Sequence, residues 1–275
     1  MGYYEIIGLK EEPFSMAPDP EFFYQSKSHG ECLDRLEISL RLNRGLNVVI
    51  GGVGIGKTML SRLLLGRFVE FGETYKFHLI LDPTWESSHE FLIYLSKMFG
   101  IEGAPSQHSE MMDRIEHYLI DSAVNSNISN VLIIDEGQKM GPNQLEIIRM
   151  LLNFETNNSK LIQVIIFAQH EIKELLDKHE NFKDRIAFGY EIQPLDLEDT
   201  VGLINHRLQV AGLLNDEEIF TKKAIDLVYE ATKGYPRKII KMCHQLIIEI
   251  LLSQKDKVTN NDVFELMKST NPLHV

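Results

Sequence analysis

Cysteine is scarce in this sequence. The 275 residues include only two cysteines, Cys32 and Cys243, which lie far apart and show no CxxC or Cys/His spacing. A disulfide framework or a zinc site is therefore not expected, and a reducing compartment fits. Because both cysteines fall within apolar helical patterns, we expect them to act as small buried hydrophobic residues.

Long hydrophobic runs are also missing. No stretch approaches the ~20 apolar residues that a membrane-spanning helix needs. The first residues, Met1 to Ile6, lack both the basic and the apolar region of a signal peptide. We therefore expect a cytoplasmic protein, with any recruitment to the inner membrane made through partners.

The sequence also lacks an excess of basic residues. The chain has 28 Lys and Arg residues against 40 Asp and Glu residues, for a net charge of −12. This balance disfavours a non-specific nucleic-acid binder, which usually carries a basic surface. One local basic group keeps a DNA-associated role open. It consists of Lys233, Arg237, Lys238 and Lys241.

Apolar runs alternate with helical patterns through the first 195 residues. Short apolar runs predict strands at residues 46–50, 77–81, 131–134 and 161–168, with a weaker one at 188–192. Helical spacing predicts helices at residues 28–43, 57–71, 87–99, 109–122, 142–153 and 171–178. Strands that are apolar on both faces and alternate with helices indicate a parallel sheet covered on both sides, a three-layer α/β sandwich.

Three regions follow from the pattern. Residues 1–27 are rich in proline and aromatic residues, which predicts an extended arm packing on the core rather than a helix. Residues 28–195 form the α/β core. Residues 196–275 show helical periodicity without a strand signal, with helices near 201–211, 239–251 and 261–267, and predict a small helical lid domain.

A glycine-rich segment joins the first predicted strand to the second helix. It reads Gly51-Gly52-Val53-Gly54-Ile55-Gly56-Lys57-Thr58 and fits the G-x-x-x-x-G-K-[ST] phosphate loop. Its glycines allow main-chain N–H groups to wrap around ATP phosphates, and the helix that follows adds its positive end. Lys57 would reach the β- and γ-phosphates, Thr58 would ligate Mg²⁺, and Met59 completes the predicted nucleotide-binding segment.

A second motif follows about 75 residues later. The run Val131 to Ile134 ends in two carboxylates, Asp135 and Glu136. Since the carboxyl ends of parallel strands face the ligand crevice, Asp135 would lie beside Mg²⁺. Glu136 would polarise the attacking water as the general base. Gln138 and Lys139 either belong to the same loop or lie on a solvated face.

These motifs, together with an N-terminal motif within residues 8–20, resemble those of the AAA+ ATPases of the general secretion pathway protein A (ExeA-type) family. The resemblance covers nearly the whole chain. It rests on Gly8-Leu9-Lys10, Glu12-Pro13-Phe14-Ser15, Pro18-Asp19-Pro20, Asp135-Glu136-Gly137-Gln138, Asn153-Phe154-Glu155-Thr156, Asp184-Arg185-Ile186 and Gly234-Tyr235-Pro236-Arg237. It implies a short form without the membrane segment and peptidoglycan-binding region of longer members.

The resemblance also implies roles for single residues. Gln169 would be the sensor-1 residue near the γ-phosphate, and Arg237 would be sensor 2, carried by the helical lid. Arg185 would be an arginine finger that reaches the ATP of a neighbouring subunit. The alternatives are that Gln169 caps a helix, that Arg237 pairs with surface carboxylates, and that Arg185 is an ordinary ion-pair partner. Arg149 is a rival finger.

Two further questions stay open at this point. Phe23, Tyr24 and His29 would either frame the adenine or pack on the core. The favoured function is Mg²⁺-dependent ATP hydrolysis by a homo-oligomer, which drives the assembly of a secretion system, secretin or type IV pilus. The alternatives are a DNA-associated regulator that resembles transposition ATPases, and an ATP-dependent scaffold for another envelope or polysaccharide locus.

Overall fold

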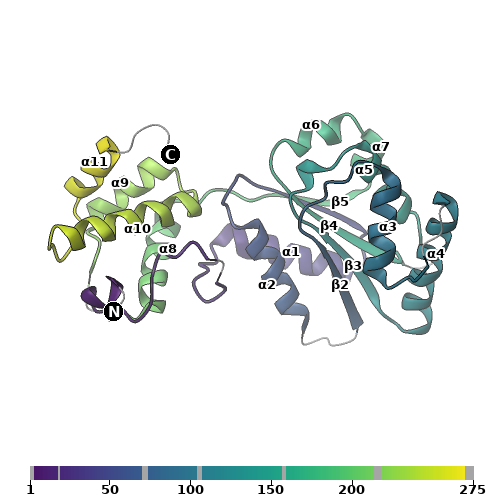
Figure 1. Cartoon of the computed structure of the whole chain (residues 1–275), viewed down its shortest axis with the longest axis horizontal. Helices are drawn as coiled ribbons and strands as arrows, with labels where there is room; N and C mark the ends of the chain where they lie inside the picture. The colour runs from purple at the N-terminus through teal and green to yellow at the C-terminus, as the bar shows by residue number, and fades with distance from the viewer. Residues whose placement is uncertain are drawn as a thin grey trace. The chain divides into compact units, whose positions relative to one another are not determined.

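A computed structural model describes most of the chain. It covers residues 3–17, 19–69, 74–103, 107–156, 159–213 and 218–269. The chain divides into two compact units, an α/β unit and a helical unit (Figure 1). The α/β unit comprises His29–Val53 and Leu60–Ile192, and the helical unit comprises Met1–Ser28, Gly54–Met59 and Gln193–Val275.

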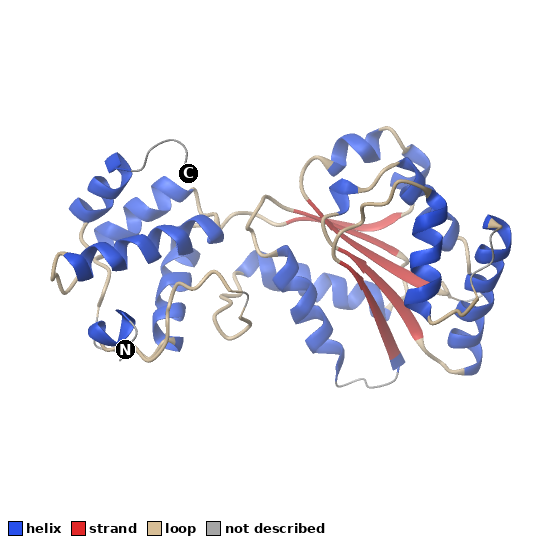
Figure 2. Ribbon diagram, in the orientation of Figure 1, coloured by secondary structure: helices blue, strands red, loops and turns tan. Residues whose placement is uncertain are grey.

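The α/β unit is built on one five-stranded parallel sheet, in the order β2-β3-β4-β1-β5. Figure 2 shows the strands in red with helices beside them. The strands are β1 (Leu46–Ile50), β2 (Tyr75–Ile80), β3 (Ser129–Ile134), β4 (Ile162–Ala168) and β5 (Ile186–Glu191). The parallel α/β sheet predicted from the sequence is confirmed. β5 gave a weak signal because it is an edge strand whose residues alternate between half-buried and exposed.

Helices connect the strands. They are α1 (Lys27–Arg41), α2 (Lys57–Val69), α3 (Ser88–Phe99), α4 (His108–Ile120), α5 (Pro142–Leu151), α6 (Ile172–Asp177) and α7 (Glu180–Lys183). A short π-helix, η3 (Asp121–Asn125), follows α4, and a 3-10 turn, η4 (Gly137–Lys139), follows β3. The sequence pattern did not predict α7, which is a single short turn.

The two faces of the sheet bury different helices. Ile162, Val164 and Ile166 of β4 belong to a hydrophobic cluster that also contains residues of α3, α4 and α5. The side chain between them, Gln163, faces the other way and donates to the Leu40 carbonyl of α1 at 2.9 Å. Because successive strand residues point to opposite faces, the sheet forms the middle of three layers.

The helical unit has its own core. Its helices are α8 (Leu197–Val210), α9 (Lys222–Thr232), α10 (Pro236–Leu252) and α11 (Asn260–Ser269). Leu203, Val228, Ile239, Leu246 and Val263 are among the buried residues of one cluster. The helical C-terminal region predicted from the sequence is present. α9 was not predicted, because its apolar positions cover little more than two turns.

The N-terminal arm belongs to the helical unit. The sequence predicted an arm that packs on the core. Leu9, Phe14 and Phe22 lie in the hydrophobic cluster that contains residues of α8 and α10. The arm also begins with a 3-10 helix, η1 (Tyr3–Ile7), instead of extended chain. Gly8, at φ 78°, ends it and donates to the Glu5 carbonyl.

The cysteines and the hydrophobic runs can now be described in the structure. Cys32 and Cys243 are both buried free thiols, and burial raises the pKa of the Cys32 thiol to about 12. They are therefore packing residues. In the part of the chain that the structure describes, no helix has the length and apolar character needed to cross a membrane.

Candidate active site

Three neighbouring strands end at the same edge of the sheet. β4 lies between β1 and β3, and the register pairs Ile50 with Ala168 and Ile134 with Ile166. With a strand spacing of about 5 Å, the ends of β1 and β3 lie about 10 Å apart. The residues that follow these three strand ends are Gly51, Asp135 and Gln169.

The glycine-rich segment leaves β1 at this edge. The Gly51 N–H donates to the Ala168 carbonyl at 3.0 Å, which continues the β1–β4 pairing by one residue. Gly54 and Gly56 have φ of 74° and 110°, a left-handed backbone that favours glycine. α2 then begins at Lys57. The sequence predicted conformational freedom for Gly51 as well, but only the two later glycines use it.

The side chains of the segment differ in exposure. Ile55 is buried, so its side chain is a packing residue, whereas Val53 is 60% exposed. Lys57 is buried and Thr58 is exposed. Met59 and Gly52 are half-buried.

Arg237 lies against the tip of this segment within the helical unit, to which Gly54–Met59 belongs. Its main-chain N–H donates to the Gly54 carbonyl at 3.3 Å. A Cβ atom on Gly54 would lie only 2.4 Å from the Arg237 Cβ, so the first turn of α10 and the glycine are in close contact. The Arg237 residue is exposed.

The acidic pair lies directly after β3. Asp135 is 3% exposed, and its main-chain N–H donates to the Ile80 carbonyl at 2.8 Å. Its Oδ1 accepts the N–H of Glu136 at 2.9 Å. Glu136 has φ 53° and ψ 34°, a left-handed conformation that is uncommon outside glycine. The chain therefore turns sharply at Glu136, and the two carboxylates have different surroundings.

Two amides hold the Glu136 carboxylate. Its Oε2 accepts hydrogen bonds from Gln138 Nε2 at 2.8 Å and from Gln169 Nε2 at 3.3 Å. Gln138 Oε1 in turn accepts the main-chain N–H of Gln169 at 2.9 Å. The sequence left the role of Gln138 open. Its signals were its position two residues after the glutamate and its place in the Asp135–Gln138 motif.

The contacts of Gln169 bear on its predicted role. Its side chain reaches Glu136, while only its carbonyl serves the following turn, by accepting the Ile172 N–H at 3.2 Å. α6 begins after Glu171, whose side chain makes no capping bond. The side chain of Gln169 thus belongs to the strand-end cluster and not to a helix cap.

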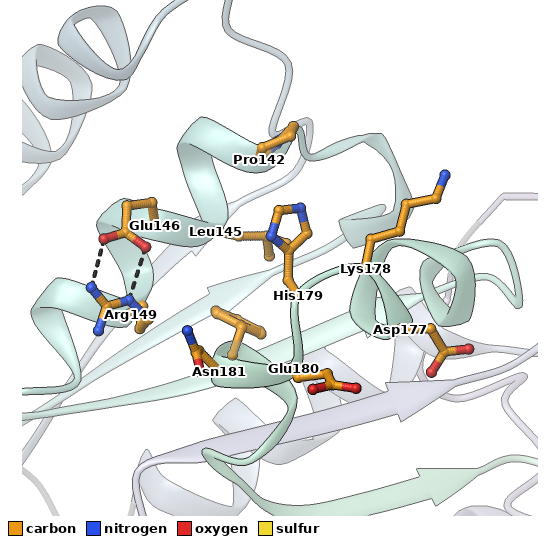
Figure 3. Close-up of a pocket in the computed structure, with 10 residues that line it drawn as sticks. Pro142, Leu145, Glu146, Arg149, Asp177, Lys178, His179, Glu180 and Asn181 are labelled. Atoms are coloured by element: carbon orange, nitrogen blue, oxygen red, sulfur yellow. Dashed lines mark hydrogen bonds and ion pairs between the residues drawn. The ribbon is translucent and has the colours of Figure 1, made fainter.

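The two candidate arginine fingers differ in their partners. Arg149 forms a two-pronged ion pair with Glu146, at 2.6 Å and 2.8 Å. The pair borders a polar cavity of about 380 Å³ between α5 and the α6–α7 turn, beside His179 (Figure 3). Arg185 is half-buried in the turn directly before β5, and among the described residues its guanidinium makes no hydrogen bond or ion pair. Arg185 is therefore the more available cation.

The ring residues predicted to frame the adenine are divided between the two units of the chain. Tyr24 belongs to the helical unit, where its hydroxyl donates to Asp199 at 3.1 Å and its ring lies 6.2 Å from that of His206. Burial, followed by the bond to Asp199, raises the Tyr24 pKa. Phe23 is half-buried, and His29 is buried in α1 of the α/β unit. Tyr24 thus packs on α8.

Sequence comparisons show which proteins the chain is similar to. A family model described as an AAA domain matches residues 40–176. The chain is similar to general secretion pathway protein A of Aeromonas hydrophila, with 31% identity over 264 residues. The match covers 95% of this chain and 47% of that protein, so the chain spans about half the length of this relative.

Solved structures resemble the fold at low sequence identity. The Aeropyrum pernix ORC2 protein, solved in ADPNP and ADP complexes, has a TM-score of 0.66 and 17% identity, over 94% of this chain and 71% of that chain. The Drosophila ORC bound to DNA has a TM-score of 0.70 and 16% identity, over 98% of this chain and 67% of that chain. At these identities the likeness concerns the fold alone.

Proposed function

Because the chain is an AAA+ ATPase of the general secretion pathway protein A type, we propose that it hydrolyses MgATP to drive the assembly of a secretion system, secretin or type IV pilus. The proposed hydrolysis is supported by the Glu136 carboxylate, which two hydrogen bonds hold in place at the end of β3. Only β4 separates β3 from β1, the strand that leads into the glycine-rich segment. The secretion part is supported by the likeness to the Aeromonas protein.

The glycine-rich segment binds the triphosphate in this proposal. Gly54 and Gly56 give the main chain the left-handed turns that let consecutive N–H groups point inward. The N-terminus of α2, beginning at Lys57, adds partial positive charge. Lys57 neutralises the β- and γ-phosphates, and Arg237 at the start of α10 approaches the nucleotide as sensor 2.

Magnesium fits the donor set. Asp135 and Thr58 offer oxygen atoms, which Mg²⁺ prefers, and the ion is usually bound by one or two carboxylates together with substrate phosphates. Among the residues placed by the structure, no group of three His, Cys, Asp or Glu side chains could hold a metal by itself. In this proposal the ion arrives with the nucleotide. When bound, it would neutralise charge on the phosphates.

Glu136 is the proposed general base. Its Oε2 accepts from two amide donors, so its other oxygen is the one that would accept a proton from water. Gln169 connects this carboxylate to the end of β4, which suits a sensor of the γ-phosphate. Arg185 serves as the finger for a neighbouring subunit in a homo-oligomer, since Arg149 is already neutralised by Glu146.

One observation favours the DNA-associated alternative. The basic group predicted from the sequence, Lys233, Arg237, Lys238 and Lys241, is exposed at the start of α10 and just before it. The net charge of −12 opposes this role, because phosphate contacts depend on a positive field. Retention on a DNA column that requires ATP and falls with salt would favour this alternative. Co-purification with secretin or pilus components would favour the assembly role.

Two variants test the catalytic assignment. Lys57→Ala should lose ATP binding, because the phosphates lose their buried cation. Glu136→Gln should still bind ATP but turn it over at least about 100-fold more slowly, because an amide cannot accept the proton of the water. Binding is measured with a fluorescent ATP analogue, and turnover by phosphate release.

An exposed cation serves as the control. Arg62→Ala on α2 should keep both binding and turnover, since Arg62 is exposed on the helix that Lys57 begins. Turnover by Glu136→Gln at the parent rate would place the base elsewhere and overturn this mechanism.

A further inference from the structure

We propose that Gln138 is a positioning residue for ATP hydrolysis, whose side-chain amide holds the Glu136 carboxylate in its working orientation and joins it to the end of β4. The inference rests on the proposed role of Glu136 as the general base. Gln138 would not touch the nucleotide. It would act through Glu136 and Gln169.

Both ends of the Gln138 amide are used. Nε2 donates to Glu136 Oε2 at 2.8 Å, and Oε1 accepts the Gln169 main-chain N–H at 2.9 Å. An amide offers a donor and an acceptor in one rigid plane, and exchanging the two would set an acceptor against a carboxylate and a donor against an N–H. The contacts therefore fix the orientation of the amide and require this residue type.

The Gln138 bridge, in which one amide contacts both Glu136 and Gln169, determines which Glu136 oxygen can accept a proton. Glu136 Oε2 receives two N–H donors, from Gln138 and Gln169, and among the described residues Oε1 receives none. The clamp holds the carboxylate plane, so Oε1 points in one direction with little rotational freedom. A general base is effective only when its acceptor atom is held within hydrogen-bond reach of the water.

The turn after β3 is shaped to make this bridge. Glu136 has φ 53°, a left-handed conformation that is strained for a residue other than glycine. Gly137 packs against β4 so tightly that a Cβ atom there would lie 2.3 Å from Ile166 Cγ2. The sharp turn at Glu136 and the close packing of Gly137 on β4 together place the Gln138 side chain between Glu136 and the end of β4.

The bridge also reaches the glycine-rich segment. The Ala168 carbonyl accepts the Gly51 N–H at 3.0 Å, and the N–H of the next residue, Gln169, donates to Gln138. The single peptide between Ala168 and Gln169 thus connects the start of the phosphate-binding segment to the support of the base. A shift of this peptide would move both.

Two substitutions at Gln138 separate positioning from simple packing. Gln138→Leu keeps the size but removes both hydrogen bonds, and should lower kcat about 10- to 100-fold with ATP affinity within about threefold of the parent. Gln138→Glu keeps the shape but sets a second carboxylate against Glu136. When protonated, the introduced carboxyl can still donate to Glu136, so its kcat should recover toward the parent as the pH falls from about 8 to about 6.

A control variant in the same turn and the Glu136→Gln protein are measured beside the two Gln138 variants. Lys139→Gln, the next residue in the same turn, changes an exposed side chain paired with exposed Asp82 and should keep parent turnover. Parent-like kcat in both Gln138 variants, beside an inactive Glu136→Gln, would overturn this inference alone. A loss that is equal in both variants at every pH, and accompanied by weaker ATP binding, would also overturn it. An active Glu136→Gln would remove the proposed base and this inference together.

Discussion

At the scale of single residues, the buried cation Arg207 explains why the proline-rich arm has a defined place. It is 6% exposed, and its guanidinium donates to the main-chain carbonyls of Pro13, Phe22 and Ser15 at 2.7 Å, 3.3 Å and 2.8 Å. It also lies over the Phe22 ring, 5.2 Å from its centre. Burial lowers the Arg207 pKa to about 10, so the group stays charged at neutral pH. Carbonyl dipoles here replace the water that the cation loses.

Removing this cation should loosen the arm. Arg207→Leu leaves the carbonyls without their donor and should lower the free energy of unfolding by about 2–4 kcal/mol. The measurement is urea unfolding followed by circular dichroism, with Arg62→Leu, an exposed arginine of α2, as the control. Arg207→Lys keeps a charge but cannot reach three carbonyls and should fall between the two. Equal stability of the Arg207→Leu and Arg62→Leu proteins would contradict the role given to Arg207.

At the scale of elements, the 3-10 turn η4 decides the geometry of the site. It packs against β4 through Gly137, whose added Cβ would also lie 3.4 Å from Ala168 Cβ and from the Phe167 carbonyl oxygen. Gly189 of β5 is a matched comparison, because an added Cβ there meets nothing within 4 Å. Neither glycine has a positive φ, so backbone strain does not separate the two positions and the space for a Cβ atom does.

Alanine at these two positions should therefore behave differently. Gly137→Ala forces the turn or β4 to move and should destabilise the protein by about 1–3 kcal/mol. Because the displaced turn carries Glu136 and Gln138, ATP turnover should fall as well. Gly189→Ala should match the parent in both respects. The checks are thermal unfolding and phosphate release, and unchanged turnover of Gly137→Ala would show that the turn tolerates displacement.

At the scale of the whole molecule, the question is whether subunits share active sites. Arg185 is half-buried without a hydrogen-bonded partner among the described residues, and Arg149 is paired with Glu146. An arginine finger has to be available to a neighbouring subunit's nucleotide, which favours Arg185. A shared site needs Glu136 from one copy and Arg185 from the next.

Mixing two inactive proteins tests this arrangement. Arg185→Ala and Glu136→Gln should each hydrolyse ATP poorly alone while binding it. In an equal mixture, about a quarter of the interfaces would combine an intact Glu136 with an intact Arg185, so about a quarter of parent turnover should return. The control mixture replaces Arg185→Ala with the double variant Arg185→Ala/Glu136→Gln and should stay inactive. No recovery in the first mixture, or full activity of Arg185→Ala alone, would remove the finger assignment.

The sequence alone determined the parallel sheet, the position of the glycine-rich segment and that of the acidic pair, because each is specified by residues that are close together in the chain. Apolar runs predict buried strands, and Gly51–Thr58 carries its chemistry within eight consecutive positions. The tertiary structure decided which side chains meet. Gln138 and Gln169 are 31 residues apart, and Arg207 and Pro13 are 194 apart. Such contacts leave no local pattern, since they depend on where the chain folds back and not on periodicity or spacing.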